Sequence, residues 1–249
     1  MAKIVSITNH KGGVGKTTTS LNLGAALASL GKHTLLIDLD PQANLTQCLG
    51  LFEPEKTVGG ALEGNYPLPI YQAEERLDIV PASLELAATE DALKNEEEPE
   101  YLLRTMIRKH TPSYDFILID TPPSLGLLTV NSFAAAHTLL IPLQAQFLSF
   151  QGLNSLKQVI ERAQKTLNKK LRLGGVIITQ YDKRKTLNRN VFELAKEQFG
   201  NAVLETKIRD NVALAEAPVA GQSIFQYAPK SRGAEDYMSL ATELLEKEL

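Results

Sequence analysis

The sequence predicts an α/β protein with a doubly wound, mostly parallel sheet and helices on both of its faces. Short apolar runs rich in β-branched residues alternate with segments of helical periodicity along the chain, which is typical of right-handed βαβ units. Several of these runs are continuously apolar, which indicates strands that are covered on both faces. Together, the alternation and the apolar runs favour this class over an all-helical or a sandwich fold.

Each expected element follows from a local pattern. Seven strands are expected, in chain order, at residues 3–9, 33–39, 77–82, 114–120, 137–143, 172–179 and 202–206. One helix is expected from about Lys16 to a C-cap at Gly31, and another over 151–168. The second helix has one apolar face, made of Leu153, Leu156, Val159, Ile160, Ala163 and Leu167. Because no repeat, flexible linker or low-complexity tract interrupts the chain, residues 1–249 are expected to form a single domain.

The composition excludes several classes of protein. The 249 residues are 43% hydrophobic and carry a net charge of −3, so the total charge does not indicate a nucleic-acid binder. The only cysteine, Cys48, excludes a disulfide framework or a multi-cysteine metal site within one chain. There is no signal peptide and no run of eighteen apolar residues, so a cytoplasmic protein is expected.

Residues 8–20, TNHKGGVGKTTTS, resemble a phosphate-binding loop with one departure from the usual pattern. Gly15, Lys16 and Thr17 satisfy the end of G-x-x-x-x-G-K-[ST], but His10 stands where the first glycine is expected and a second lysine, Lys11, follows it. Glycines let backbone N–H groups face a phosphate, and the helix that follows adds its positive end. The expected nucleotide-binding residues are Lys11, Gly12, Gly13, Val14, Gly15, Lys16, Thr17 and Thr18.

Carboxylates for a magnesium ion follow two of the apolar strands. Asp120 ends the run FILID and is expected to hold the ion through a water molecule, and the Thr17 hydroxyl is an expected ligand. Asp38 and Asp40, in LLIDLDPQ, lie on one side of an extended chain, and Asp40 stands where the strand ends, a suitable place for an attacking water. All three carboxylates are expected near the phosphate loop, at the carboxyl ends of parallel strands.

These motifs, KGGVGKTT (11–18), DLDPQAN (38–44), YDFILIDTPPSLG (114–126), IRDNVALAEAP (208–218) and SRGAEDY (231–237), extend over nearly the whole chain. The sequence resembles the ParA/Soj chromosome-partitioning ATPases, P-loop NTPases of the ParA/MinD family with a deviant Walker A motif. The resemblance implies hydrolysis of ATP to ADP with Mg²⁺, and a homodimer that sandwiches two nucleotides and is stimulated by a ParB-type centromere-binding protein.

The resemblance also implies roles for particular residues. Lys11 would reach the phosphates of the partner subunit's ATP, and Gly12 would allow the two loops to approach each other closely. Lys16 would bind the β- and γ-phosphates, and Asp40 would position the hydrolytic water. Asp38 would support the metal without touching it directly, and Pro218 would border the adenine. The expected catalytic residues are Lys11, Lys16 and Asp40, and the expected metal residues are Thr17, Asp38 and Asp120.

A basic segment indicates a DNA-binding surface. The window from Lys165 to Arg189 contains eight basic residues and one acid, a net charge of +7. We expect the C-terminal end of this window to bind DNA phosphates without recognising the base sequence, and so to place the protein on the nucleoid. The expected residues are Lys183, Arg184, Lys185, Arg189 and Arg209. The resemblance implies a further basic residue at the position of Ala213, for which either Arg209 or Arg232 is the expected substitute.

Two other functions remain open for a deviant Walker A protein. One is a membrane-associated positioning ATPase of the MinD type. Against it, the polar face of the last helix is acidic, so that anionic lipid would repel it and no membrane partner is expected. The other is a P-loop synthetase that phosphorylates a small carboxylate substrate.

Overall fold

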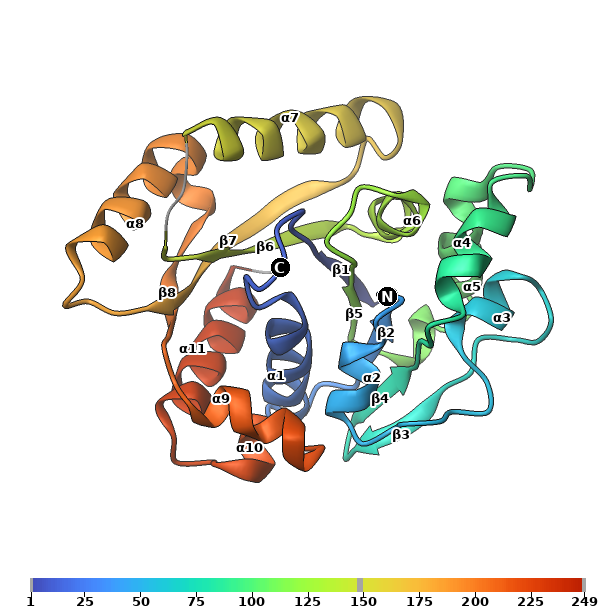
Figure 1. Ribbon diagram of the computed structural model, residues 1–249, viewed down its shortest axis with the longest axis horizontal. Helices are drawn as coiled ribbons and strands as arrows, with labels where there is room; N and C mark the ends of the chain where they lie inside the picture. The colour runs from blue at the N-terminus through green and yellow to red at the C-terminus, as the bar shows by residue number, and fades with distance from the viewer. Residues whose placement is uncertain (1, 147–149, 248–249) are drawn as a thin grey trace.

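A computed structural model describes residues 2–146 and 150–247, and the side chains of all of these except 150–156. One eight-stranded sheet runs through the molecule in the order β3-β4-β2-β5-β1-β6-β7-β8 (Figure 1). Neighbouring strands are parallel except β3 and β4, which are antiparallel. The strands are β1 (Lys3–Ile7), β2 (Thr34–Asp38), β3 (Tyr71–Glu74), β4 (Leu77–Val80), β5 (Phe116–Asp120), β6 (Thr138–Gln144), β7 (Arg172–Tyr181) and β8 (Val203–Arg209).

The predicted fold class is confirmed, and all seven expected strands are present. The eighth, β3, was not expected from the sequence. Its residues, YQAE, are exposed or half-buried, so that no apolar run marks the strand. It exists because the chain turns back at Arg76, which has a left-handed φ of 59°, and pairs with the buried strand β4. This pairing is a tertiary effect that local sequence does not report.

Helices cover both faces of the sheet. One face is packed by α1 (Lys16–Ser29), α2 (Asn44–Cys48), α10 (Ile224–Tyr227) and α11 (Arg232–Glu246). The other face is packed by α3 (Val58–Leu62), α4 (Leu86–Leu93), α5 (Leu102–Ile107), α6 (Leu127–Ala135), α7 (Phe150–Thr166) and α8 (Thr186–Phe199). Figure 1 shows α7 and α8 above strands β6 to β8, with α1 and α11 below them. Short segments complete the chain: α9 (Ala213–Glu216), η1 (Pro99–Tyr101), η2 (Thr111–Ser113), η3 (Gly200–Ala202) and η4 (Ala217–Ala220).

The expected helices are present with small changes at their ends. Helix α1 ends at Ser29, and Gly31 follows with a left-handed φ of 81°, as a C-terminal glycine does. In α7, Ile160 and Ala163 are buried and Val159 is half-buried, whereas the side chains of Leu153 and Leu156 lie outside the described residues. The apolar face of α11 packs against α1 and β8, with Tyr237 and Leu240 buried. Among the described residues, no helix is both long enough and apolar enough to span a membrane.

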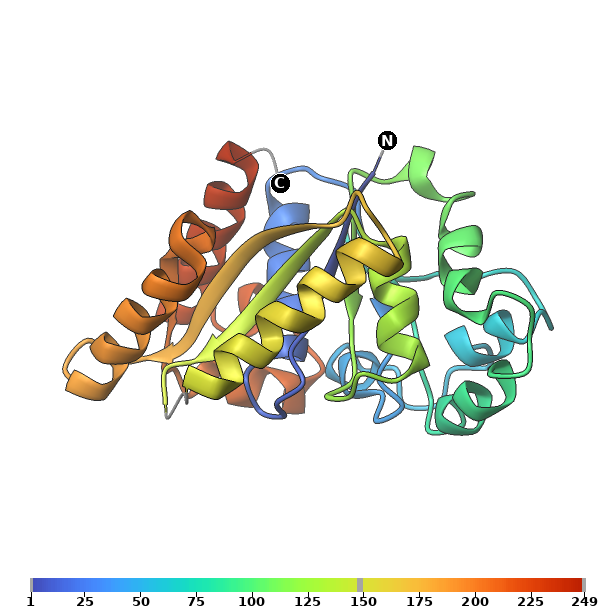
Figure 2. The ribbon, with the colours of Figure 1, turned by 90° about the horizontal axis from the view of Figure 1, so that it is seen from above.

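The topology brings the predicted site residues to one edge of the sheet. The loops that follow β1, β2, β5 and β7 all leave the carboxyl ends of parallel strands, along the lower side of the molecule in Figure 2. Asp38 and Asp120 are paired residues on the neighbouring strands β2 and β5, and Ile7 of β1 is also paired with Asp120. The phosphate-loop segment and the carboxylates therefore start from adjacent strand ends.

Candidate functional site

The loop between β1 and α1 has the backbone conformation that its glycines predict. Gly13 and Gly15 have left-handed φ values of 74° and 89°, which residues with a Cβ rarely adopt. At Gly12, by contrast, an added Cβ would meet no atom within 4 Å. Gly13 and Gly15 are thus required by the loop itself, whereas nothing in the described part of this chain requires glycine at position 12.

The two lysines of the loop have different surroundings. Lys16 is only 7% exposed, and its Nζ donates to the Lys11 carbonyl at 3.3 Å. Burial lowers the pKa of Lys16, while the charges of Asp120 and Asp40 oppose that shift. The side chain of Lys11 is exposed at the mouth of the loop. Lys16 therefore faces into the chain's own site, and Lys11 is available to another molecule.

Asp120 is held by two hydroxyl groups from α1. Its carboxylate accepts from the Thr17 hydroxyl at 2.7 Å and from the Ser20 hydroxyl at 2.9 Å. It is fully buried, and this burial, together with the charge of Asp38, raises its pKa. The structure thus brings Thr17 and Asp120 together, as the sequence predicted, and adds Ser20, whose role could have been found only from its helical position one turn after Lys16.

Asp38 holds the loop that carries Asp40. One oxygen of Asp38 accepts from the Asp40 backbone N–H at 3.0 Å, and the other accepts from the Thr46 N–H and hydroxyl at 2.9 and 2.7 Å. Asp40 is 6% exposed, and its own carboxylate accepts from the Gln42 N–H at 2.9 Å. Asp38 thus fixes the loop that carries Asp40, and this position fits indirect support of a metal.

The donors at this edge fit a magnesium ion. The Thr17 hydroxyl and Asp120 are hard oxygen ligands on adjoining elements, and Mg²⁺ is typically held by one or two protein groups together with phosphate oxygens and waters. Residues 2–146 and 150–247 contain no cluster of three or more His, Cys, Asp or Glu side chains that could bind a metal without such help. The site therefore suits a metal that arrives with a nucleotide.

Two residues of β7 that the sequence analysis missed also contact the phosphate loop. The Thr179 hydroxyl donates to the Val14 carbonyl at 2.8 Å, and Gln180 Nε2 donates to the Gly13 carbonyl at 3.2 Å. No motif marks these residues, because their proximity depends on the strand order. The loop is further anchored through Asn9, which accepts from the Lys11 N–H and donates to the Pro142 carbonyl.

Pro218 lies in η4, on the same side of the sheet as α1. This segment packs against α2, and the Ile224 N–H that follows it donates to the Asn22 side chain of α1 at 2.8 Å. Pro218 is half-buried and its neighbour Val219 is 89% exposed. No described contact joins Pro218 to the phosphate loop, so its place beside an adenine stays a prediction.

The basic residues do not form one continuous surface. Lys183, Arg184, Lys185 and Arg189 are exposed in the loop after β7 and the first turn of α8. Lys165, Lys169, Lys170 and Arg172 lie at the other end of β7, roughly 30 Å away along ten strand residues. The +7 window is therefore split between the two opposite ends of strand β7.

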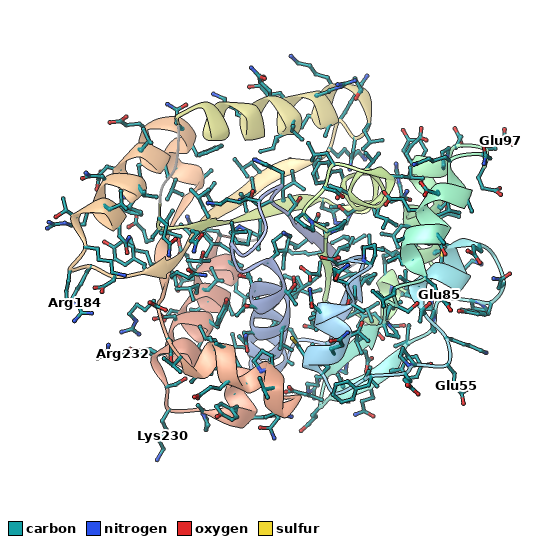
Figure 3. The ribbon with its side chains drawn as sticks, in the orientation of Figure 1. Glu55, Glu85, Glu97, Arg184, Lys230 and Arg232 are labelled. Carbon is teal, nitrogen blue, oxygen red and sulfur yellow. The ribbon has the colours of Figure 1, made fainter. Side chains whose placement is uncertain are left out.

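Two of the predicted DNA-binding arginines are paired with acids. Arg184 forms an ion pair with Asp182 at 2.8 Å, and Arg209 binds both Asp236 and Glu235. These carboxylates raise the pKa of Arg209 and offset its charge. Figure 3 shows Arg232 and Lys230 on the same side of the molecule as Arg184, and both are exposed.

The parallel sheet and the glycine loop between β1 and α1 define a P-loop nucleotide-binding fold. A family model described as an AAA domain matches residues 2–173. The chain is 43% identical to the sporulation initiation inhibitor protein Soj of Bacillus subtilis, over 98% of each chain. It is 40% identical to the chromosome partitioning protein ParA of Myxococcus xanthus, over 100% of this chain and 89% of that protein. The chain therefore belongs to the ParA/Soj family of ATPases.

A solved structure supports the same fold. The cobyrinic acid a,c-diamide synthase of Mycobacterium smegmatis, solved with bound ADP and magnesium, superposes with a TM-score of 0.87. It is 33% identical and is matched over 99% of this chain and 95% of that one. The fold is thus shared by partitioning proteins and by an enzyme named as a synthase.

The raised pKa of Asp120 leads to a pH prediction. The folded protein keeps a proton on this carboxyl at pH values where the unfolded chain has lost it, so this group's contribution to the free energy of unfolding falls as the pH rises above about 4. Asp120→Asn removes the titration, and both hydroxyl partners can donate to or accept from the amide. The free energies of unfolding of Asp120→Asn and wild type are measured by urea unfolding without metal at pH 5 and pH 8. The value for the variant minus the value for wild type should be larger at pH 8 than at pH 5 by at least about 1 kcal/mol.

The exposed carboxylate of Asp91 supplies the control for this measurement. Asp91→Asn should differ from wild type by nearly the same amount at both pH values. If the difference in free energy of unfolding between Asp120→Asn and wild type also showed no dependence on pH, the Asp120 carboxyl would be ionised in both the folded and the unfolded state. The expected rise in its pKa would then be wrong.

Proposed function

We propose that the chain is an ATP-dependent dimerising ATPase for chromosome or plasmid partitioning. It binds ATP and ADP with Mg²⁺, and its ATP-bound dimer binds DNA non-specifically. A ParB-type centromere-binding partner stimulates hydrolysis, and the protein associates with the nucleoid. The observation that carries this proposal is the pair of lysines in one loop, with Lys16 buried beside Asp120 and Asp40 and Lys11 exposed.

Each site residue then has a role that its surroundings support. Lys16 binds the β- and γ-phosphates, Thr17 and Asp120 hold Mg²⁺, and Asp40 positions the attacking water. Asp38 fixes the loop that carries Asp40. The backbone of Gly12, Gly13, Val14, Gly15 and Thr18 surrounds the phosphates, and Pro218 borders the adenine.

The dimer follows from the exposed end of the loop. Two triphosphates that face each other repel unless cations lie between them, and Lys11 from each subunit supplies one positive charge to the opposite site. The open space beside Gly12 fits this arrangement, because glycine there is explained by the approach of a second loop rather than by the fold of one chain. ATP then becomes part of the interface between the subunits.

The DNA-binding surface is proposed at the carboxyl end of β7. Among the described residues, Lys183, Lys185 and Arg189 have no acidic partner, so their charges are available to phosphates. Arg184 shares its charge with Asp182, and Arg209 shares its charge with two acids, so both should contribute less. A dimer doubles the number of phosphate contacts and therefore binds DNA more tightly than a monomer.

Arg189→Glu should lower the affinity of the ATP-bound dimer for random-sequence duplex at least about tenfold at low salt. It should also reduce the slope of log affinity against log salt by about one per subunit, since each neutralised phosphate contributes about 0.9. The affinity is measured by fluorescence anisotropy at several salt concentrations.

Lys169→Glu makes the same charge change at the opposite end of β7 and serves as the matched control. It should leave both the affinity and the slope within about twofold of wild type. Equal losses in the two variants would mean that net charge, and not this surface, governs DNA binding.

The proposed function is tested by measuring molecular mass and DNA retention with a non-hydrolysable ATP analogue and with ADP. A dimer that retains duplex with the analogue, and a monomer that does not with ADP, is the expected result. A dimer that ignores DNA but binds anionic vesicles would indicate a membrane-associated positioning ATPase. ADP release that requires a small carboxylate substrate, with no dimer or DNA binding, would instead indicate a synthetase.

A further inference from the structure

Gln180, near the end of β7, has an unusual backbone. Its φ is 51°, in the left-handed region that residues other than glycine rarely adopt. The pairing of β7 with β8 shifts register between Val176 and Ile178 and again between Ile178 and Tyr181, and Gln180 lies within the second of these irregularities. A non-glycine residue persists in this conformation only where surrounding contacts hold it, and such positions concentrate at functional sites.

The contacts that hold Gln180 lead to the phosphate loop. Its Nε2 donates to the Gly13 carbonyl at 3.2 Å, and its Oε1 accepts from Gln144 Nε2 at the end of β6. The neighbouring Thr179 hydroxyl donates to the Val14 carbonyl at 2.8 Å. Two consecutive residues of β7 therefore hold two consecutive carbonyl groups of the loop.

These carbonyl groups belong to the peptide units that would face a phosphate. The Gly13 carbonyl and the Val14 N–H share one rigid plane, as do the Val14 carbonyl and the Gly15 N–H. In a trans peptide the two groups point in opposite directions, so a plane held by β7 through its oxygen presents its N–H to the other side. A phosphate that reorients the Val14 N–H must also move the oxygen bound by Gln180.

The same end of β7 supports the basic loop. Two residues after Gln180, the Asp182 N–H donates to the Asn188 side chain at 2.7 Å, and the Asp182 carboxylate binds Arg184. The buried Asn188 amide in turn donates to the carbonyl of Ala145, the residue after Gln144. The two ends of the segment that carries Lys183 and Lys185 are thus joined to each other, and Asn188 also binds Ala145, which directly follows the Gln144 that holds Gln180.

We propose that Gln180 is a positioning residue that couples the state of the phosphate loop to the DNA affinity of the basic loop. The coupling rests on the proposed ATP-dependent DNA binding. ATP moves the Gly13 peptide, Gln180 follows, and the Lys183–Lys185 segment changes its presentation. Coupling between two binding sites is reciprocal, so duplex DNA must raise the affinity for ATP by the same factor by which ATP raises the affinity for DNA.

The test compares wild type with two variants that affect the Gly13 contact differently. Gln180→Met keeps the length of the side chain but loses both hydrogen bonds. Gln180→Glu can still accept from Gln144 but cannot donate to the Gly13 carbonyl. DNA affinity is measured by anisotropy with AMPPNP and with ADP, and AMPPNP affinity is measured with and without a random-sequence duplex. In both variants the ratio of the DNA affinity with AMPPNP to the DNA affinity with ADP should fall at least about tenfold. The factor by which duplex DNA raises the affinity for AMPPNP should fall equally.

Gln72→Met, on the exposed edge strand β3, makes the same chemical change away from the site and should keep both ratios. Melting curves that match wild type show that the variants are folded. If Gln180→Met does not fold, the test is made with Gln180→Glu alone. If both variants kept the wild-type ratio within about twofold, the inference would be overturned while the proposed function stood. If wild type itself showed no difference between AMPPNP and ADP, the proposed DNA switch would fail first, and the inference with it.

Discussion

Replacing Lys16 with alanine is expected to lower the affinity for Mg·ATP at least about 100-fold, the loss of a charge-assisted contact to phosphate. Lys16 is 7% exposed and lies near Asp120 and Asp40, and among the described residues it is the one buried lysine or arginine. Without it, the site loses the buried positive charge that offsets the two carboxylates and the triphosphate. Isothermal titration calorimetry with Mg·ATP measures the change directly.

Lys94→Ala serves as the control, because Lys94 is exposed and pairs only with Asp91 among the described residues. It should bind Mg·ATP like wild type. Circular dichroism melting must show that Lys16→Ala remains folded, since removing a cation near buried acids also alters stability. Tight nucleotide binding by a folded Lys16→Ala variant would disprove the proposed phosphate site.

The second large effect is expected at Asp40, where alanine should reduce ATP turnover about 10²–10⁴-fold, the usual contribution of a positioned general base. ATP affinity should stay within a few-fold of wild type, because Asp40 acts on the attacking water and not on the bound phosphates. Asp40→Asn keeps the size of the side chain and can still accept from the Gln42 N–H, so it separates charge from loop geometry. Phosphate release at saturating ATP, combined with a binding titration, gives both quantities.

Asp91→Asn, on the exposed surface, provides the matched loss of one carboxylate and should not change turnover. A fall in turnover of equal size in Asp40→Ala and Asp40→Asn would assign the effect to the charge. If only Asp40→Ala were impaired, the loop held by Asp38 would be responsible. Normal turnover in both would remove Asp40 from the proposed mechanism.

The phosphate loop was predictable because its requirements are local. Left-handed glycines, a lysine and a hydroxyl residue at fixed spacing between a strand and a helix determine a loop of this kind, and Gly13 and Gly15 have the expected conformations. The strands were predictable for a similar reason, since their continuous apolar runs reflect burial on both faces. Only β3 lacked such a run, and it was missed.

Contacts that depend on strand order were not predictable. Thr179 and Gln180 reach the loop because a single strand, β6, lies between β1 and β7 in the sheet. In sequence, more than 160 residues separate them from Gly13 and Val14. The family resemblance implied different roles for Asp38 and Asp40, but only the folded loop shows that the backbone engages both oxygens of Asp38.

The sequence by itself determined the fold class, the phosphate loop and the family of this protein, because periodicity and motif spacing are properties of contiguous residues. The tertiary structure decided how charge is distributed. It divided one basic window between the two ends of β7, paired Arg209 with acids from α11, and left Lys11 exposed while burying Lys16. The physical reason is that burial and ion pairing depend on which elements pack together, and that is set by strand order and helix packing across the whole chain.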